Sequence, residues 1–295
     1  MDADGVGSAT ARSGRSDARG PWAPLGRFAV LAIVGAVPFW VLGAVGGTIP
    51  GFPSRLPWTA LAACVPAVAA FMLARHEGGL SGLRAQFRVP RHGWVWWFAA
   101  VTASMLPTYA DALVHHGPWA PPDPSLVAGL LALYLVGALG EELGWTAFAL
   151  PRLLRLTGSA TTSALILGAY WMVWHLVPYL TTGNPPAWVA AQSGQALLSR
   201  CVWVGLVVGH ARAAAPRLAG GTDLGPEPPT DIGAPVLPVL CAPLAVLAHA
   251  LSNLAWSTSP GGGLDYDPVF VDAVLLPLAV SFLWLASRRT AGWTP

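Results

Sequence analysis

Eight apolar stretches of about 20 residues, separated by short breaks, take up most of this chain and limit what it can fold into. Hydrophobic residues make up 54% of the 295 residues, and Asp, Glu, Lys and Arg make up only 10%. A soluble domain needs about 25% charged residues to cover its surface, so the composition excludes that class and predicts an all-α, polytopic membrane helix bundle. The predicted spans are residues 27–47, 57–75, 93–114, 125–150, 161–182, 195–214, 234–257 and 268–287.

The basic residues are distributed unevenly between the two ends of these spans. All 16 are arginines, and 14 of them fall in the N-terminal segment, after the second, fourth and sixth spans, or at the C-terminus. Cytoplasmic segments of membrane proteins carry such an excess, so the pattern predicts about eight transmembrane helices with both termini cytoplasmic. Residues 1–25, rich in Gly, Ala, Ser and Asp, are predicted to form a disordered cytoplasmic tail ahead of a transmembrane domain at 26–290.

Four ionisable side chains lie deep inside the predicted spans. Glu141 and Glu142 are in the fourth span, His175 is in the fifth and His249 is in the seventh. Glu141 is about 24 Å from the outer end of its span, and the histidines are about 20 to 22 Å from the inner ends of theirs. Ionisable groups at such depths are costly and mark functional sites. Two carboxylates and two imidazoles on three spans are the composition of a hydrolytic or metal site.

The depths of the glutamates and the histidines agree only to about 10 Å, and a kink near Gly140 and Gly144 would close that difference. His249 and Asn253 are four residues apart and therefore share one helix face. On the fifth span, Trp171, Trp174 and His175 share a face, and the indoles would wall the site with aromatic surface. The remaining ionisable residues of the spans lie near span ends, where side chains reach water, and are interpreted as structural: Asp111, Arg200, His210 and Asp272.

These residues leave three functions open. The first is an intramembrane protease, the second a non-catalytic membrane immunity or regulatory protein, and the third an ion-coupled transporter that uses the glutamates and histidines as an ion path. A protease requires Glu141 and the two imidazoles to converge on one water molecule, whereas a transporter would distribute them along a pathway. The relative positions of these three side chains therefore separate the hypotheses.

Three motifs in this order resemble the CPBP intramembrane proteases, also called the Abi or CAAX-protease family, which includes the type II CAAX prenyl endopeptidases. The first family motif, EExxxR, is similar to Glu141–Thr146, which reads EELGWT. The second, an aromatic residue followed four residues later by His, is similar to Trp171 and His175. The third, HxxxN, matches His249 and Asn253. The family core covers residues 125–257.

The resemblance implies an intramembrane endopeptidase that hydrolyses a peptide bond of a membrane-associated substrate. That substrate would be a prenylated, CAAX-like tail, a bacteriocin-type peptide or a membrane-anchored regulator. Membrane lipid is the other expected partner, and the net charge of +2 gives no basis for nucleic-acid binding. By the same resemblance, Glu141 would activate the attacking water and Glu142 would orient partners or share the proton. His175, His249 and Asn253 would complete the site.

The resemblance leaves the cofactor open. Two imidazoles and one carboxylate form a normal catalytic zinc set, which here would be Glu141, His175 and His249. A metal-free mechanism, in which a buried glutamate near two histidines acts as the base, is also open.

One departure from the family pattern concerns the first motif, whose arginine is replaced by Thr146. The replacement leaves open how Glu142 is neutralised and whether the protein is active, and Arg152, six residues further on, is the candidate substitute. The Lys-free composition, rich in Ala, Arg and Gly, suggests a bacterial genome of high GC content and hence the bacterial plasma membrane.

Overall fold

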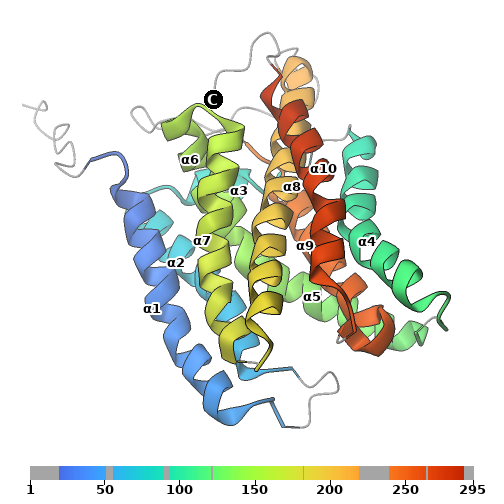
Figure 1. Cartoon of the computed structure of the whole chain (residues 1–295). Helices are drawn as coiled ribbons and strands as arrows, with labels where there is room; N and C mark the ends of the chain where they lie inside the picture. The colour runs from blue at the N-terminus through green and yellow to red at the C-terminus, as the bar shows by residue number, and fades with distance from the viewer. Residues whose placement is uncertain are drawn as a thin grey trace, which may run out of the picture.

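A computed structural model describes residues 20–288 except for 51–55, 90–92, 121, 182, 219–238 and 264. Within these ranges the chain forms helices and no β-strand, which confirms the predicted all-α class (Figure 1). Residues 1–19 of the predicted tail lie outside the described residues, and the first helix begins at Ala23. In chain order the helical segments are α1 (Ala23–Gly46), η1 (Trp58–Cys64), α2 (Val65–His76), α3 (Leu80–Ala85), α4 (Trp94–His116), α5 (Pro124–Gly144), η2 (Trp145–Ala149), α6 (Leu150–Thr157), α7 (Ala160–Thr181), α8 (Pro186–Leu218), α9 (Ala242–Thr258), η3 (Pro260–Gly263) and α10 (Pro268–Ser287).

Each predicted span coincides with helix over most of its length, but two of the predicted starts are wrong. α8 begins at Pro186 instead of residue 195, because a proline in the first helical turn lacks only an N–H that would have no partner there. α9 begins at Ala242 instead of residue 234. Residues 239–241 ahead of it are not helical, and residues 234–238 of the predicted span lie outside the described ranges.

Five helical segments of the described chain are long and apolar enough to cross a membrane: Ala23–Gly46, Trp58–His76, Pro124–Thr157, Ala160–Thr181 and Pro268–Ser287. They coincide with the first, second, fourth, fifth and eighth predicted spans. α4, α8 and α9 occupy the other three, and α9 has only 17 residues. A helical membrane bundle is therefore established, and the number of eight spans stays a prediction.

Helix ends that the arginine distribution assigns to the same side of the membrane contact one another. At the predicted cytoplasmic side, Arg212 of α8 donates a hydrogen bond to the carbonyl oxygen of Arg288 after α10, at 2.8 Å. At the opposite side, Asp111 of α4 accepts one from the backbone N–H of Asp267 before α10, at 3.2 Å. These contacts agree with the predicted up-and-down order of the helices, and the side that faces the cytoplasm stays a prediction.

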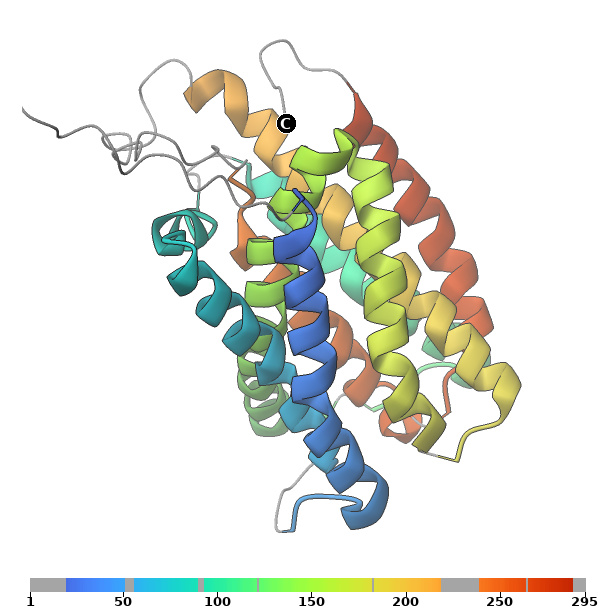
Figure 2. The same cartoon turned by 90° about the vertical axis from the view of Figure 1, so that its left-hand side faces the viewer.

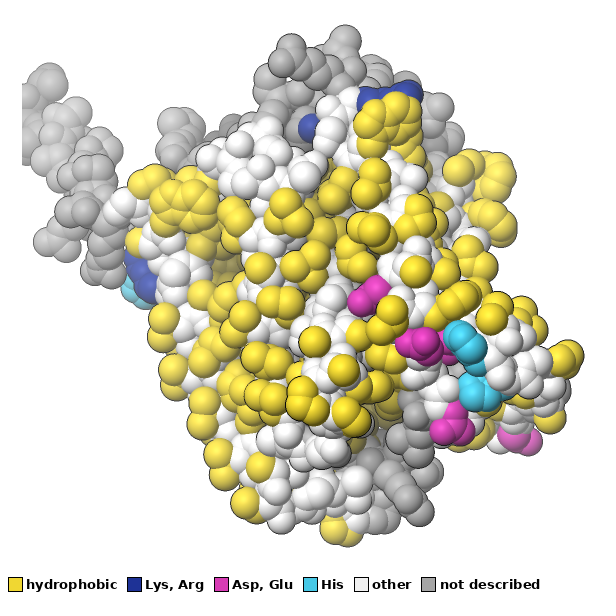
Figure 3. All heavy atoms as spheres, in the orientation of Figure 1, with side chains coloured by type: hydrophobic (Ala, Val, Ile, Leu, Met, Phe, Trp, Pro, Cys, Tyr) yellow, Lys and Arg dark blue, Asp and Glu magenta, His cyan; other side chains and the backbone are white. Residues whose placement is uncertain are grey.

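The visible surface of the bundle is largely apolar. Figure 3 shows hydrophobic side chains across most of this face, with basic side chains at its top and left edges and a group of acidic and histidine side chains in its lower right half. Large apolar side chains such as those of Val45, Trp94 and Val136 are exposed, which is unfavourable in water and matches a lipid environment. The apolar helices support an integral membrane protein.

The helices that carry the predicted site residues pack side by side. α5 contacts α2 and α9, and α8 contacts α7, α9 and α10. Figure 2, turned from the view of Figure 1, shows α1 running along α7 and α2. The C-terminal end of α5 and the middle parts of α7, α8 and α9 thus border one region of the bundle interior.

Candidate active site

The paired glutamates lie at the C-terminal end of α5, and both are buried. Glu141 is 6% exposed and Glu142 is fully buried. As neighbours on a helix they point about 100° apart, so each meets different partners. The first faces α7, and the second faces α8 and α9, as their hydrogen bonds show.

Glu141 is held by two tryptophans. Its Oε2 atom accepts hydrogen bonds from Nε1 of Trp171 at 2.8 Å and from Nε1 of Trp145 at 3.3 Å. An indole N–H can only donate, so both bonds favour a carboxylate oxygen as acceptor. In the described chain Oε1 forms no hydrogen bond with protein groups, which leaves it available to a substrate or a water molecule.

Glu142 binds three side chains from three helical segments. Oε2 accepts from Oγ1 of Thr146 at 2.5 Å and from the guanidinium of Arg200 at 2.7 Å. Oε1 lies 2.9 Å from Nδ1 of His249. A buried guanidinium requires a negative partner, so we assign Glu142 as a carboxylate, and His249 then donates through Nδ1.

Both histidines share one tautomer by the same reasoning. Nδ1 of His175 lies 3.0 Å from the backbone oxygen of Trp171, and a carbonyl oxygen cannot donate. Nδ1 therefore carries a hydrogen in His175 as well as in His249. In each neutral ring Nε2 keeps a lone pair and can accept a proton.

The ring of Trp171 connects the predicted catalytic residues. Besides its bond to Glu141, its centroid lies 4.2 Å from the ring of His175 and 5.6 Å from that of His249. Trp203 of α8 stacks on His249 at 4.6 Å with an interplanar angle of 25°. The structure thus brings Glu141, His175 and His249 together around one indole.

The C-terminal end of α5 is where the sequence predicts a kink that would bring the glutamates to the depth of the histidines. Gly140 and Gly144 let α5 approach the backbone of η1 and α2, because a Cβ atom would lie 2.6 Å from the carbonyl oxygen of Ala63 and 2.7 Å from that of Pro66. Directly after Gly144 the chain forms the π-helical turn η2. Such turns bend helices, and they often occur at functional sites. A π-turn thus follows directly after Gly144, and the kink that would close the difference in depth stays a prediction.

The close approach of Gly144 gives a first prediction. Gly144→Ala places a methyl group against Pro66 and should lower the free energy of unfolding by about 1–3 kcal/mol, with reduced activity, because the end of α5 must shift. Gly137→Ala on the same helix meets no atom within 4 Å and should be neutral or slightly stabilising. Thermal unfolding in detergent compares the two, and equal midpoints would show that this contact is not tight.

The structure corrects the predicted roles of two arginines, Arg152 and Arg200. Arg152 does not reach Glu142, and that prediction is wrong: its guanidinium donates to Glu77 at 3.1 Å and to the carbonyl of Phe148 at 2.9 Å. Arg200, interpreted as a residue near a span end, is fully buried and binds Glu142. Arg200 and Trp203, which stacks on His249, are side chains of the site that the sequence reasoning missed.

Asn253 lies on α9 one turn after His249 and is partly buried. Among the described residues it forms no hydrogen bond with the glutamates or histidines of the site. Its amide stays a predicted participant that would act on a bound substrate.

The metal set that the resemblance implies, Glu141, His175 and His249, stays a prediction. No group of three or more His, Cys, Asp or Glu residues in the described ranges is arranged to hold a metal ion. The acid nearest to His249 is Glu142, which already neutralises the guanidinium of Arg200. Among the described residues, the atoms of the predicted set that no protein group occupies are Nε2 of His175, Nε2 of His249 and Oε1 of Glu141, and these would hold such an ion.

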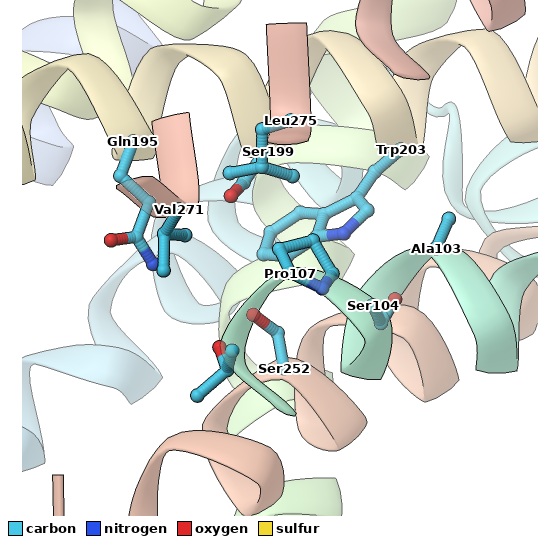
Figure 4. A pocket seen from close by; sticks show the side chains of 10 residues that line it. Ala103, Ser104, Pro107, Gln195, Ser199, Trp203, Ser252, Val271 and Leu275 are labelled. Carbon is cyan, nitrogen blue, oxygen red and sulfur yellow. The ribbon is translucent and has the colours of Figure 1, made fainter. Parts of the chain in front are cut away.

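A small cavity adjoins the site on the far side of Trp203. Figure 4 shows Gln195 and Ser199 of α8, Ser104 of α4 and Ser252 of α9 around it. Hydroxyl and amide groups of this kind can hold water in a helix bundle. Because Trp203 both lines the cavity and stacks on His249, the cavity and the catalytic cluster share a wall.

A comparison with protein families agrees with the motif analysis. The family model described as type II CAAX prenyl endopeptidase Rce1-like matches residues 123–220, which confirms the family resemblance. The match contains the first two motifs and Arg200, and it ends before the third motif at His249 and Asn253. No curated protein matches the sequence at a significant level.

Proposed function

We propose, from the membership of residues 123–220 in the type II CAAX prenyl endopeptidase family, that this integral membrane protein is an intramembrane endopeptidase. The family supports protease activity of the CAAX type. The observation that carries the proposal at the level of residues is the meeting of Glu141, His175 and His249 around the indole of Trp171.

The first step would be activation of water by Glu141. The two indole N–H groups hold Oε2, so Oε1 would be the oxygen that accepts a hydrogen from a water molecule entering the cluster. One hydrogen of that water would bind Oε1, and the other would bind the lone pair on Nε2 of His175. Glu141 takes the first proton, and the oxygen attacks the carbonyl carbon of the scissile peptide bond.

The second step would be collapse of the tetrahedral intermediate. The side-chain amide of Asn253 would donate to the developing oxyanion, as amide groups do in oxyanion holes. The C–N bond then breaks, and the proton held by Glu141 passes to the leaving nitrogen through Nε2 of His249. Glu142 would stabilise the imidazolium formed in that transfer, because its carboxylate binds Nδ1 at 2.9 Å. The products are a carboxylic acid and an amine.

The same geometry bears on the transporter hypothesis. An ion path would distribute ionisable groups across the membrane, whereas these side chains gather around one ring. This clustering favours hydrolysis over ion-coupled transport. A regulatory protein without activity could keep the cluster, and only an assay separates it from a protease.

The substrate class follows from the family and the membrane setting. We propose a prenylated, CAAX-like tail or another membrane-anchored peptide, cleaved in the bacterial plasma membrane. Purified protein in liposomes should shorten a farnesylated CAAX peptide and leave the same peptide without its lipid largely uncut. Mass spectrometry of the products identifies the bond. If neither this peptide nor a panel of transmembrane peptides is cut, the protein is not a protease.

Metal analysis checks the metal-free form of this mechanism. Purified protein should contain zinc below one ion per chain, and a chelator should leave peptide cleavage unchanged, since no three His, Cys, Asp or Glu side chains of the described residues are arranged to hold a metal ion. His175→Ala should not alter the metal content. If the wild type instead contains one zinc ion per chain and this variant loses it, the metal-free mechanism is wrong and the zinc set of Glu141, His175 and His249 is supported.

A further inference from the structure

Arg200 lies among the side chains of the site without being one of its predicted catalytic residues. It is fully buried, and its guanidinium donates to Glu142 at 2.7 Å. In the described ranges Glu142 is the acid with which it forms an ion pair. A buried cation of this kind is stable only beside a negative partner, so these two residues depend on each other.

The guanidinium also contacts both tryptophans of the cluster. Its central carbon lies 4.4 Å from the ring of Trp171 and 4.9 Å from the ring of Trp203. Trp171 binds Glu141 and packs on His175, and Trp203 stacks on His249. One arginine thus contacts the supports of Glu141 and of both histidines.

Thr146 relates Arg200 to the first motif. Thr146 occupies the place of the arginine in the EExxxR motif, and its hydroxyl binds Oε2 of Glu142 at 2.5 Å. The guanidinium of Arg200 reaches the same oxygen from α8. A short side chain at position 146 and a long cation at position 200 therefore meet at one atom.

We infer that Arg200 is a positioning residue that replaces, from a different helix, the arginine missing at Thr146 and holds Glu142 and the two tryptophans in their active arrangement. It contacts neither the proposed water nor a substrate, and it acts through Glu142 on His249 and through Trp171 on Glu141. The expected effect of Arg200 on activity rests on the proposed function, whereas its ion pair with Glu142 does not.

Moving the charge back to the motif tests this inference. Arg200→Gln should lower kcat by about 100-fold at unchanged KM, since a misplacement of catalytic groups by about 1 Å costs that much. The double variant Thr146→Arg/Arg200→Gln, which returns a cation to the carboxylate from the motif position, should regain at least about tenfold of the loss. Arg152→Gln is the matched control, because Arg152 pairs with Glu77 outside the site, and it should stay within about threefold of the wild type.

The outcomes separate this inference from the proposed function. If Arg200→Gln cuts peptides within about threefold of the wild type, Arg200 has no positioning role. If Arg200→Gln does not fold, Arg200→Lys replaces it. That variant keeps the charge but loses the planar guanidinium that packs on Trp171 and Trp203, and it should fold and lose about tenfold in kcat; full activity would overturn the inference.

A cycle of thermal unfolding needs no activity at all. Glu142→Gln and Arg200→Gln should each lower the unfolding midpoint, and the double variant should lower it by less than the sum of the two shifts. Additive shifts would overturn the pairing even if the wild type cuts peptides. Non-additive shifts in a protein that cuts none would leave the pair intact and remove only the proposed function.

Discussion

Glu141→Gln should abolish measurable peptide cleavage, with kcat reduced by about 1,000-fold, and should leave the protein folded. The amide oxygen of Gln can still accept from the indoles of Trp145 and Trp171, so the packing around position 141 is preserved. The amide cannot take a proton from water, and a general base contributes about 100- to 10,000-fold to such reactions. Initial rates on a lipid-anchored peptide in liposomes measure the effect.

The control for Glu141→Gln is the unfolding midpoint of the same preparation. Because Glu141 forms hydrogen bonds but no ion pair in the described structure, its free energy of unfolding should change by no more than about 1 kcal/mol. Substrate should still bind, so the variant should retain a labelled peptide that the wild type releases as fragments. Product formation at the wild-type rate would remove Glu141 from the mechanism.

The sequence was sufficient to find the residues that are costly in a membrane. Glu141, His175 and His249 stand out because few ionisable side chains lie far from the ends of the apolar stretches. The shared face of Trp171 and His175 follows from their spacing along one helix, and their rings do meet, at 4.2 Å. Rarity and periodicity are local properties, so they can be read from a single chain.

Arg200 shows where such reasoning fails. With the span placed at 195–214, Arg200 is close to an end and its charge can reach water. In the structure α8 begins at Pro186, which places Arg200 about 21 Å along the helix, too far for its side chain to leave the interior. The depth of a residue depends on where its helix starts. The start of α8 is hidden from a hydropathy pattern by polar residues in its first part, Gln192, Ser193 and Gln195.

The predicted contact between Arg152 and Glu142 is wrong for a different reason. It follows Glu142 closely in sequence, but η2 and α6 separate them, and α6 directs the Arg152 side chain to Glu77 at the end of α2. A π-turn changes the direction of every later side chain on the helix, and the sequence carries little local signal for it. Contacts between helices, such as the one from α8 to Glu142, require the tertiary arrangement.

Glu142→Gln should abolish cleavage as Glu141→Gln does but, unlike that variant, should also lower the unfolding midpoint strongly, although the two positions are adjacent and the chemical change is identical. Glu142 accepts hydrogen bonds from Thr146, Arg200 and His249, and all three donors lose a charged acceptor in the variant. A glutamine has one acceptor oxygen, so its NH₂ group must face one of these donors. The guanidinium of Arg200 is left as an unpaired charge in the protein interior.

Breaking a buried ion pair by removing one partner costs about 3–5 kcal/mol, so Glu142→Gln should lower the unfolding midpoint strongly and also abolish cleavage. Glu142→Gln/Arg200→Gln should recover part of the midpoint, since no charge is left unpaired, while cleavage stays absent because His249 has lost its carboxylate. Thermal unfolding in detergent measures both variants beside Glu141→Gln. A midpoint loss of the same size at positions 141 and 142 would contradict the assignment of one glutamate to the reaction and the other to the ion pair that supports it.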